Sequence, residues 1–196
     1  WRVRDLPALA AAADAWVGDV PTSTNGWLCQ VSVRLLRGDA AAVDAWLLEQ
    51  IGAPVPADPL SPEHARLSAA LSLALGNGWN VSPRRIEPAM VDPLVDLGLR
   101  TARAEVPEDG WLRMLGHWLF QRTDGARRLR DGLRADLLGG DAFRTMGALR
   151  LATYLRHLPW DQGNVDPDVF LRVSGGLEER WKAAPAGREK DALAML

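Results

Sequence analysis

Asp141–Leu158, DAFRTMGALRLATYLRHL, is the longest apolar-rich run of the chain that lacks proline and keeps helical spacing. At about 100° per residue its leucines and alanines cover roughly half of the helix circumference. The remaining side is also apolar, but it carries three polar side chains, Arg150, Tyr154 and His157. We therefore predict that residues 141–158 form a single central helix with neighbouring helices on nearly every side.

Helix start and stop signals recur along the rest of the chain. Asp5, Asp39 and Ser61 have the residue type and position of N-caps, and Gly38 and Gly52 follow apolar-periodic segments as stop signals. The other predicted helices cover about 6–17, 25–37, 40–51, 62–75, 93–104, 110–122 and 125–138, with a last one from Pro167 that Gly175-Gly176 is expected to split.

No segment alternates between apolar and polar residues with period two, so strands are not expected. The predicted fold class is all-α, a single domain of about eight or nine helices arranged as an irregular helical bundle or a short, α-solenoid-like stack of helical hairpins. We expect this helical domain to cover residues 1–184 and a weakly ordered tail to cover 185–196.

Two sequence echoes favour the stack of hairpins. Gly26-Trp27-Leu28, followed by Leu35 and Asp39, matches Gly110-Trp111-Leu112, followed by Leu119 and Asp124. AAADAW at 11–16 resembles AAVDAW at 41–46. Such pairs can be diverged helical repeats, although the tetratricopeptide consensus does not fit and a tryptophan-rich helical chain can produce such matches by chance.

Composition indicates a globular protein, since 47 % of the 196 residues are hydrophobic and 24 % are charged. The single cysteine, Cys29, cannot form an internal disulfide, and its apolar neighbours predict a buried thiol. There is no signal-peptide pattern and no run of 18 or more apolar residues, so we expect a cytoplasmic protein that does not enter a membrane.

Arginine accounts for 21 of the 23 basic residues, a bias typical of bacteria with GC-rich genes. Because the chain begins at Trp1 and not at methionine, we expect a processed product or a segment of a longer protein.

Charge is distributed unevenly. Residues 1–110 hold 9 basic and 14 acidic side chains, whereas 111–160 hold 9 and 4, and 161–196 hold 5 and 7. A basic segment within an acidic protein more often contacts the acidic part than nucleic acid, so a nucleic-acid partner is not favoured.

Catalytic and cofactor motifs are missing from the sequence. It contains no G-x-x-x-x-G-K-[ST], no lysine before Lys182, no H-E-x-x-H, no C-x-x-C and no G-x-S-x-G. The three histidines, His64, His117 and His157, have no local spacing that would build a metal site with Cys29. We expect no cofactor and no metal, and the missing motifs favour a non-enzymatic function over an enzymatic one.

Two groups of side chains are candidate binding sites. Arg150, Tyr154 and His157 share a helix face and are candidate residues of a pocket. Trp160 and Trp79, two of nine tryptophans, lie in loops flanked by Gly, Asn and Pro and are candidate rim residues. The competing interpretation is a buried network in which the polar heads satisfy one another. The second group, Arg127, Arg130 and Arg134, forms a stripe that could bind an anion or an acidic partner, or could be a solvated face beside Asp131 and Asp136.

These observations favour a non-enzymatic helical protein-interaction module of a bacterial cytoplasmic protein, such as an adaptor, a regulatory domain or a toxin-neutralising partner. The alternative is a helical-bundle enzyme or small-molecule-binding protein with its pocket against helix 141–158. Nucleic-acid binding is the third hypothesis.

Overall fold

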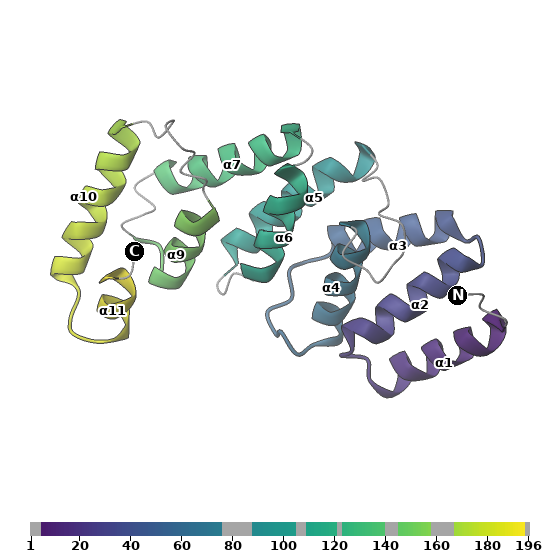
Figure 1. The fold of residues 1–196 in the computed structure, drawn as a ribbon. Coiled ribbons are helices and arrows are strands. Elements are labelled where there is room, and N and C mark those ends of the chain that lie inside the picture. Colours follow the sequence, from purple (N-terminus) through teal and green to yellow (C-terminus); the bar gives the residue numbers. More distant parts are fainter. Residues whose placement is uncertain are drawn as a thin grey trace. The chain divides into compact units, whose positions relative to one another are not determined.

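The computed structural model describes residues 5–75, 88–104, 109–120, 123–139, 145–157 and 167–194 (Figure 1). Within these ranges every regular element is a helix and no strand occurs, which confirms the predicted all-α class. The chain divides into two compact units, residues 1–97 and 98–196, and each is described by itself. None of the described helices is both long enough and apolar enough to cross a membrane.

The first unit contains α1 (Leu6–Asp19), α2 (Thr24–Leu36), α3 (Ala40–Gly52), α4 (Pro62–Ala74) and the first part of α5 (Pro88–Arg103). Helix α2 packs against α1, α3 and α4, and α4 also contacts α3 (Figure 1). The core consists of aliphatic side chains that are at most 2 % exposed, among them Val31, Val43, Leu47, Ile51, Leu67, Leu71 and Leu94.

Three of the predicted helix starts are capped by side chains. Asp5 accepts a hydrogen bond from the amide of Ala8 at 2.9 Å, and Ser61 accepts one from the amide of His64 at 3.1 Å. Ser23 caps α2 in the same way. Asp39 occupies the N-cap position of α3, as expected, but its side chain makes no capping hydrogen bond.

This difference between Ser61 and Asp39 predicts unequal costs of substitution. Ser61→Ala removes the acceptor for the His64 amide and is expected to lower the free energy of unfolding by about 1 kcal/mol. Asp39→Ala, at the same position of a neighbouring helix, is expected to change it by less than about 0.5 kcal/mol, because no capping bond is lost. Urea unfolding of both variants measures the difference, and equal losses would contradict the assignment of the caps.

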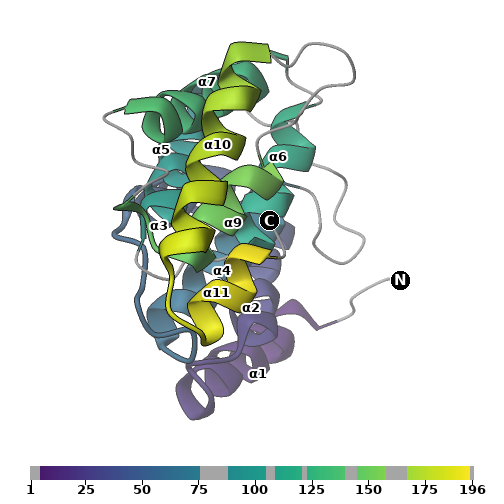
Figure 2. The same ribbon diagram turned by 90° about the vertical axis from the view of Figure 1, so that its left-hand side faces the viewer.

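The second unit contains the end of α5 together with α6 (Asp109–Phe120), α7 (Thr123–Leu138), α9 (Ala148–His157), α10 (Pro167–Ala183) and α11 (Arg188–Ala194). Helix α6 packs against α7 and α9, while α11 contacts both α9 and α10 (Figure 2). The buried side chains of this unit include Leu112, Leu115, Leu129, Leu133, Leu137, Leu151 and Tyr154.

The prediction of one continuous helix over 141–158 is wrong. Met146 lies in a bend and Gly147 is not helical, so α9 begins at Ala148, where the amide of Leu151 bonds the carbonyl of Gly147 at 2.9 Å. Glycine favours such a break because it loses more conformational freedom in a helix than other residues. The guanidinium of Arg180 donates a hydrogen bond to the carbonyl of Met146 at this break. Residues 140–144 and 158 lie outside the described ranges.

Other boundaries also differ from the predictions. Helix α10 runs without interruption through Gly175 and Gly176, so the predicted split is wrong. Helix α5 begins at Pro88 and contains Pro93, which was expected to start it. Cys29 is exposed and not buried, because it lies on the outer side of α2. Helix α11 lies within the segment 185–196 and its Leu193 is only 5 % exposed, while the division into a domain and a tail at residue 184 stays a prediction.

Candidate functional site

A polar cluster joins three helices of the second unit. The hydroxyl of Tyr154 on α9 donates a hydrogen bond to Asp136 Oδ2 on α7, at 2.9 Å. Arg103, at the end of α5, donates two hydrogen bonds to the same carboxylate, from Nε to Oδ2 at 2.7 Å and from Nη2 to Oδ1 at 2.9 Å. Asp136 is therefore the centre of the cluster, and it accepts donors from the two flanking helices.

Arg150 completes the cluster on the α9 side. Its guanidinium carbon lies 5.8 Å from the centroid of the Tyr154 ring, one helical turn away, within range of a cation–π interaction. Its Nε is buried and has no hydrogen-bond partner among the described residues. The predicted neighbours Arg150 and Tyr154 thus lie together, but the hydroxyl of Tyr154 is already occupied by Asp136.

The electrostatics of the cluster follow from these contacts. The hydrogen bond from Arg103 holds the pKa of Asp136 below its ordinary value, and the bond from Tyr154 acts in the same direction against the effect of burial. Burial raises the pKa of Tyr154, chiefly because a buried phenolate would lose its hydration. Tyr154 is fully buried and the Asp136 side chain is 23 % exposed, so this arrangement holds three helices together and presents little open surface to a ligand.

The remaining members of the predicted pocket are not placed against this cluster. Trp79 and Trp160 lie outside the described residues. His157 is the last residue of α9, and its side chain is outside the described atoms. A pocket built from Arg150, Tyr154, His157, Trp160 and Trp79 therefore stays a prediction.

The predicted arginine stripe lies on α7. Arg127 forms an ion pair with Asp124 one turn earlier, at 2.6 Å, and both side chains are more than 60 % exposed. Arg130 and Arg134 take part in interactions of their own. Exposed pairs of this kind contribute little to stability, so the stripe has the character of a solvated helix face.

Sequence reasoning did not find Arg103 as a member of the cluster. It contacts Asp136 across 33 residues of sequence, and nothing in the local spacing relates the two. In the sequence, Asp136 is recognisable only as an acid near the arginine stripe. The apolar and polar residues on one face of α9 did point to such a partner, because the hydroxyl of a fully buried tyrosine needs a hydrogen-bond acceptor, which a neighbouring helix can supply.

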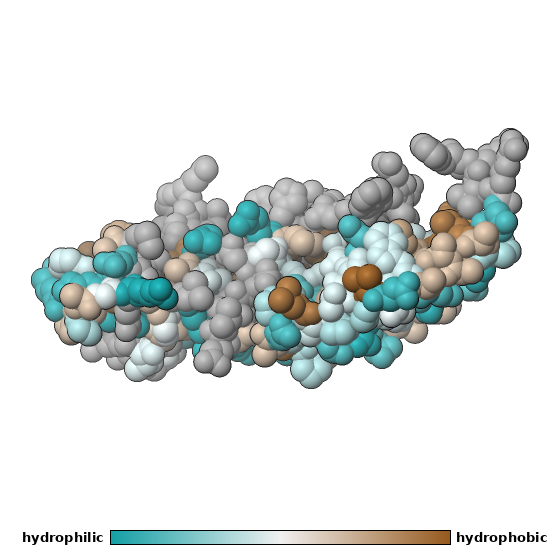
Figure 3. All heavy atoms as spheres, turned by 90° about the horizontal axis from the view of Figure 1, so that it is seen from below, coloured by the Kyte–Doolittle hydropathy of each residue, from teal (hydrophilic) through white to brown (hydrophobic). Residues whose placement is uncertain are grey.

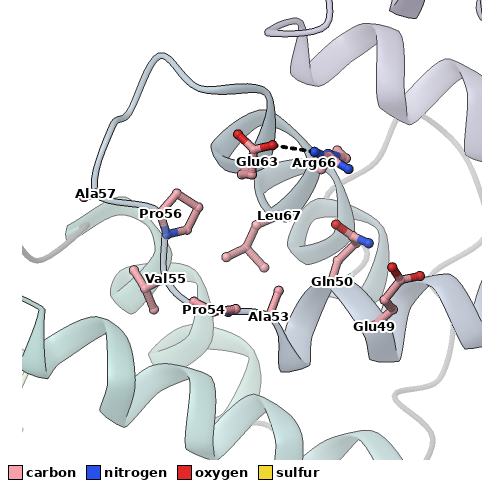
Figure 4. Close-up of a pocket in the computed structure, with 10 residues that line it drawn as sticks. All are labelled: Glu49, Gln50, Ala53, Pro54, Val55, Pro56, Ala57, Glu63, Arg66 and Leu67. Carbon is pink, nitrogen blue, oxygen red and sulfur yellow. Dashed lines mark hydrogen bonds and ion pairs between the residues drawn. The ribbon is translucent and has the colours of Figure 1, made fainter.

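A cavity of about 440 Å³ lies in the first unit, between the end of α3, the loop that follows it and the start of α4 (Figure 4). We call it the α3–α4 cavity. Its lining residues are Glu49, Gln50, Ala53, Pro54, Val55, Pro56, Ala57, Glu63, Arg66 and Leu67. In Figure 4, Leu67 points from α4 toward the proline-rich loop, Gln50 points from α3 toward α4, and Glu63 and Arg66 lie above them.

Leu60 follows the loop that lines this cavity, and it is 79 % exposed. The turn that carries it is fixed by Asp58. The side-chain carboxylate of Asp58 accepts a hydrogen bond from the amide of Leu60 at 2.9 Å. The backbone carbonyl of Asp58 accepts two more, from the hydroxyl of Ser61 at 2.8 Å and from the amide of Ser61 at 3.1 Å. A large apolar side chain is therefore presented to solvent on a turn with a defined conformation.

Other large apolar side chains are also exposed in both units. On the face shown in Figure 3, hydrophobic residues form separate patches among hydrophilic ones. Those more than a third exposed include Leu9, Trp16, Val20, Leu36 and Leu48 in the first unit, and Phe170, Leu171 and Trp181 in the second. Single exposed residues of this type are common, so Leu60 stands out by its degree of exposure, on a turn that follows the cavity-lining loop in sequence.

A second cavity, of about 290 Å³, is lined by residues of α1, α2 and α3 and by Arg37 and Asp39, which lie between α2 and α3. Its charged and polar side chains are Asp14, Gln30, Arg34, Arg37 and Asp39, and Gln30 donates to Asp14 at 2.8 Å. Across the described ranges, no group of three or more His, Cys, Asp or Glu side chains is placed to hold a metal ion.

Comparison of the chain with models of protein families, with curated proteins and with solved structures finds no match.

Proposed function

We propose that the chain is a non-enzymatic helical protein-interaction module, an adaptor, regulatory or toxin-neutralising domain of a bacterial cytoplasmic protein. The observation that carries this proposal is Leu60, a leucine that is 79 % exposed on a turn fixed by Asp58, in the segment that follows the loop lining the α3–α4 cavity. Full burial of a leucine side chain in a partner would contribute about 2 kcal/mol to binding. The fixed turn lowers the entropic cost of that contact, because the loop is already ordered before binding.

The alternative, a small-molecule-binding protein or enzyme with its site at α9, has less support. The hydroxyl of Tyr154 donates to Asp136, and both oxygens of Asp136 also accept bonds from Arg103. Within this cluster, the buried Nε of Arg150 has no hydrogen-bond partner among the described residues. A ligand at this cluster would have to displace existing bonds, whereas a partner at Leu60 would bury a surface that now faces solvent.

Leu60→Ser tests the proposal. The variant is expected to weaken the complex with the natural partner about 10-fold to 100-fold, because the apolar contact is lost. Its free energy of unfolding should change by less than about 0.5 kcal/mol, since the side chain is exposed and the bonds of the turn come from Asp58 and Ser61. The measurement is quantitative co-purification from the source cells, followed by an affinity titration with the polypeptide that is recovered.

Leu171→Ser is the matched control, because Leu171 is 65 % exposed on α10 in the second unit. This variant should retain the same polypeptide at wild-type level. If Leu60→Ser also retained it at that level, or if the wild-type chain recovered no specific polypeptide, the proposal would be wrong.

A further inference from the structure

The α3–α4 cavity has the shape and lining to hold an aliphatic chain. One wall is the loop Ala53–Ala57, which contains Pro54, Val55 and Pro56, and Leu67 of α4, only 2 % exposed, lies opposite (Figure 4). These groups offer apolar contact and few hydrogen-bonding side chains. Methylene groups of a partner side chain would therefore be favoured against this wall.

The rim of the cavity carries an excess of negative charge. Arg66 is the single cation among the lining residues, and its charge is compensated by Glu63 at 2.6 Å. Its guanidinium also lies over the ring of Trp27, 5.4 Å from the centroid. The charge of the Glu63 carboxylate is shared with Arg66, whereas no ion pair joins Glu49 to another described residue. One carboxylate of the rim is thus left uncompensated.

The backbone adds to this negative character. The C-terminal end of α3, at Gly52, lies beside the cavity, and the last carbonyls of a helix carry partial negative charge. The start of α4 would have the opposite effect, but Ser61 accepts one of its free amides and Glu63 lies in its first turn. Residues 1–97 together hold eleven acidic and seven basic side chains, so the net charge of this unit also favours a positively charged ligand.

From this lining we infer that the α3–α4 cavity receives a lysine or arginine side chain of a partner protein, on a segment whose neighbouring residues contact Leu60. The methylenes of that side chain lie against Pro54, Val55 and Leu67, and its cationic head meets Glu63 and Glu49. A purely apolar side chain would remove water from these carboxylates without replacing its hydrogen bonds, which is unfavourable. This inference rests on the proposed interaction function and specifies the chemistry of its partner.

The test uses three small probes in NMR titrations of the full chain. They are acetyl-arginine N-methylamide, the neutral acetyl-citrulline N-methylamide, which has nearly the same shape, and the anionic acetyl-glutamate N-methylamide. We expect the arginine probe to give saturable shifts, confined to the amides of Gln50, Ala53, Ala57 and their neighbours, with a Kd of about 10 mM. The citrulline and glutamate probes should bind at least about fivefold more weakly, because they lack the positive charge.

The double variant Glu49→Gln, Glu63→Gln removes both carboxylates and should weaken the arginine probe by about fivefold. Glu178→Gln, an exposed carboxylate on α10 paired with Lys182, removes one unit of negative charge in the second unit and should leave the affinity unchanged. Equal binding of arginine and citrulline, tighter binding of the glutamate probe through the buried Nε of Arg66, or no saturable shift at about 50 mM would each overturn the inference.

The two proposals fail in distinguishable ways. If the arginine probe does not bind at the cavity but Leu60→Ser still loses the partner polypeptide, the cationic side chain is wrong and the interaction function stands. If the probe binds as expected but neither the wild type nor any variant recovers a partner, the cavity chemistry is right and the proposed function is wrong.

Discussion

Asp136→Ala is expected to lower the free energy of unfolding by about 3 kcal/mol, one of the largest effects of any single substitution in the second unit. The reason is the position of this carboxylate between two donors. Tyr154 is fully buried and its hydroxyl would lose its acceptor, while Arg103 would lose two charge-assisted hydrogen bonds. Arg103 is half exposed and can be rehydrated, so most of the cost comes from Tyr154 and the nearby Arg150.

Asp131→Ala is the matched control for this substitution, because Asp131 is exposed on the same helix. It should change stability by less than about 0.5 kcal/mol. Tyr154→Phe removes one hydrogen bond and keeps the ring, so it should cost about 1 kcal/mol. Chemical unfolding of the three variants measures these values. A loss for Asp136→Ala no larger than that for Asp131→Ala would contradict the central role of this carboxylate.

The cluster also predicts how stability depends on pH. The folded-state pKa of Asp136 is lowered, so its contribution is complete above the unfolded pKa, near 4, and is lost as pH falls through the lower folded value. The folded-state pKa of Tyr154 is raised, so its contribution is complete below about 10 and is lost as pH rises further. Asp136→Asn should remove the part of the acid dependence below about pH 4 that comes from this residue, which unfolding curves between about pH 2 and 6 would measure.

Gly98→Val is expected to cost about 3 kcal/mol, through steric overlap and not through a lost bond. A Cβ at Gly98 on α5 would lie 2.8 Å from Leu129 Cδ1 on α7 and 3.6 Å from Leu115 Cδ1 on α6. Conversely, a Cβ at Gly132 on α7 would lie 2.6 Å from Leu99 Cδ2 on α5. Two glycines therefore let the end of α5 approach α7 closely, and each accommodates a leucine of the other helix.

Gly175→Ala replaces a glycine at a position where no neighbouring atom would contact the added side chain. A Cβ at Gly175, inside α10, would meet no atom within 4 Å. This variant should gain about 0.5–1 kcal/mol, because alanine loses less conformational freedom in a helix than glycine. Thermal unfolding of both variants checks the contrast. If Gly98→Val were as stable as the wild type, the close approach of α5 and α7 would be wrong.

The sequence predicted the helices well where their ends are marked by local chemistry. Asp5, Ser23 and Ser61 cap as their residue types suggest, because an N-cap depends on a side chain and an amide only three positions apart. It failed at Met146-Gly147, where Arg180, 34 residues away, bonds the backbone at the break. Helix periodicity in 141–158 contains no information about that contact, since the apolar pattern continues across the break.

The polar cluster could be predicted only in part. Arg150 and Tyr154 share one face of α9, and their proximity follows from a spacing of one turn. Arg103 and Asp136 join them only because α5 and α7 pack closely around Gly98 and Gly132, which is a property of the tertiary structure. The exposure of Leu60 could not be predicted from the sequence either, because a leucine in a proline-rich loop can either pack inward or face solvent.

Native mass spectrometry of the protein purified gently from its own cells tests the proposed interaction function most directly. The intact mass is compared before and after denaturation, for the wild type and for Leu60→Ser. The account predicts that the wild type carries an additional polypeptide that is released on denaturation, and that this polypeptide is absent or strongly reduced in Leu60→Ser. A wild-type chain that carries only a small molecule, or no additional mass, would contradict it.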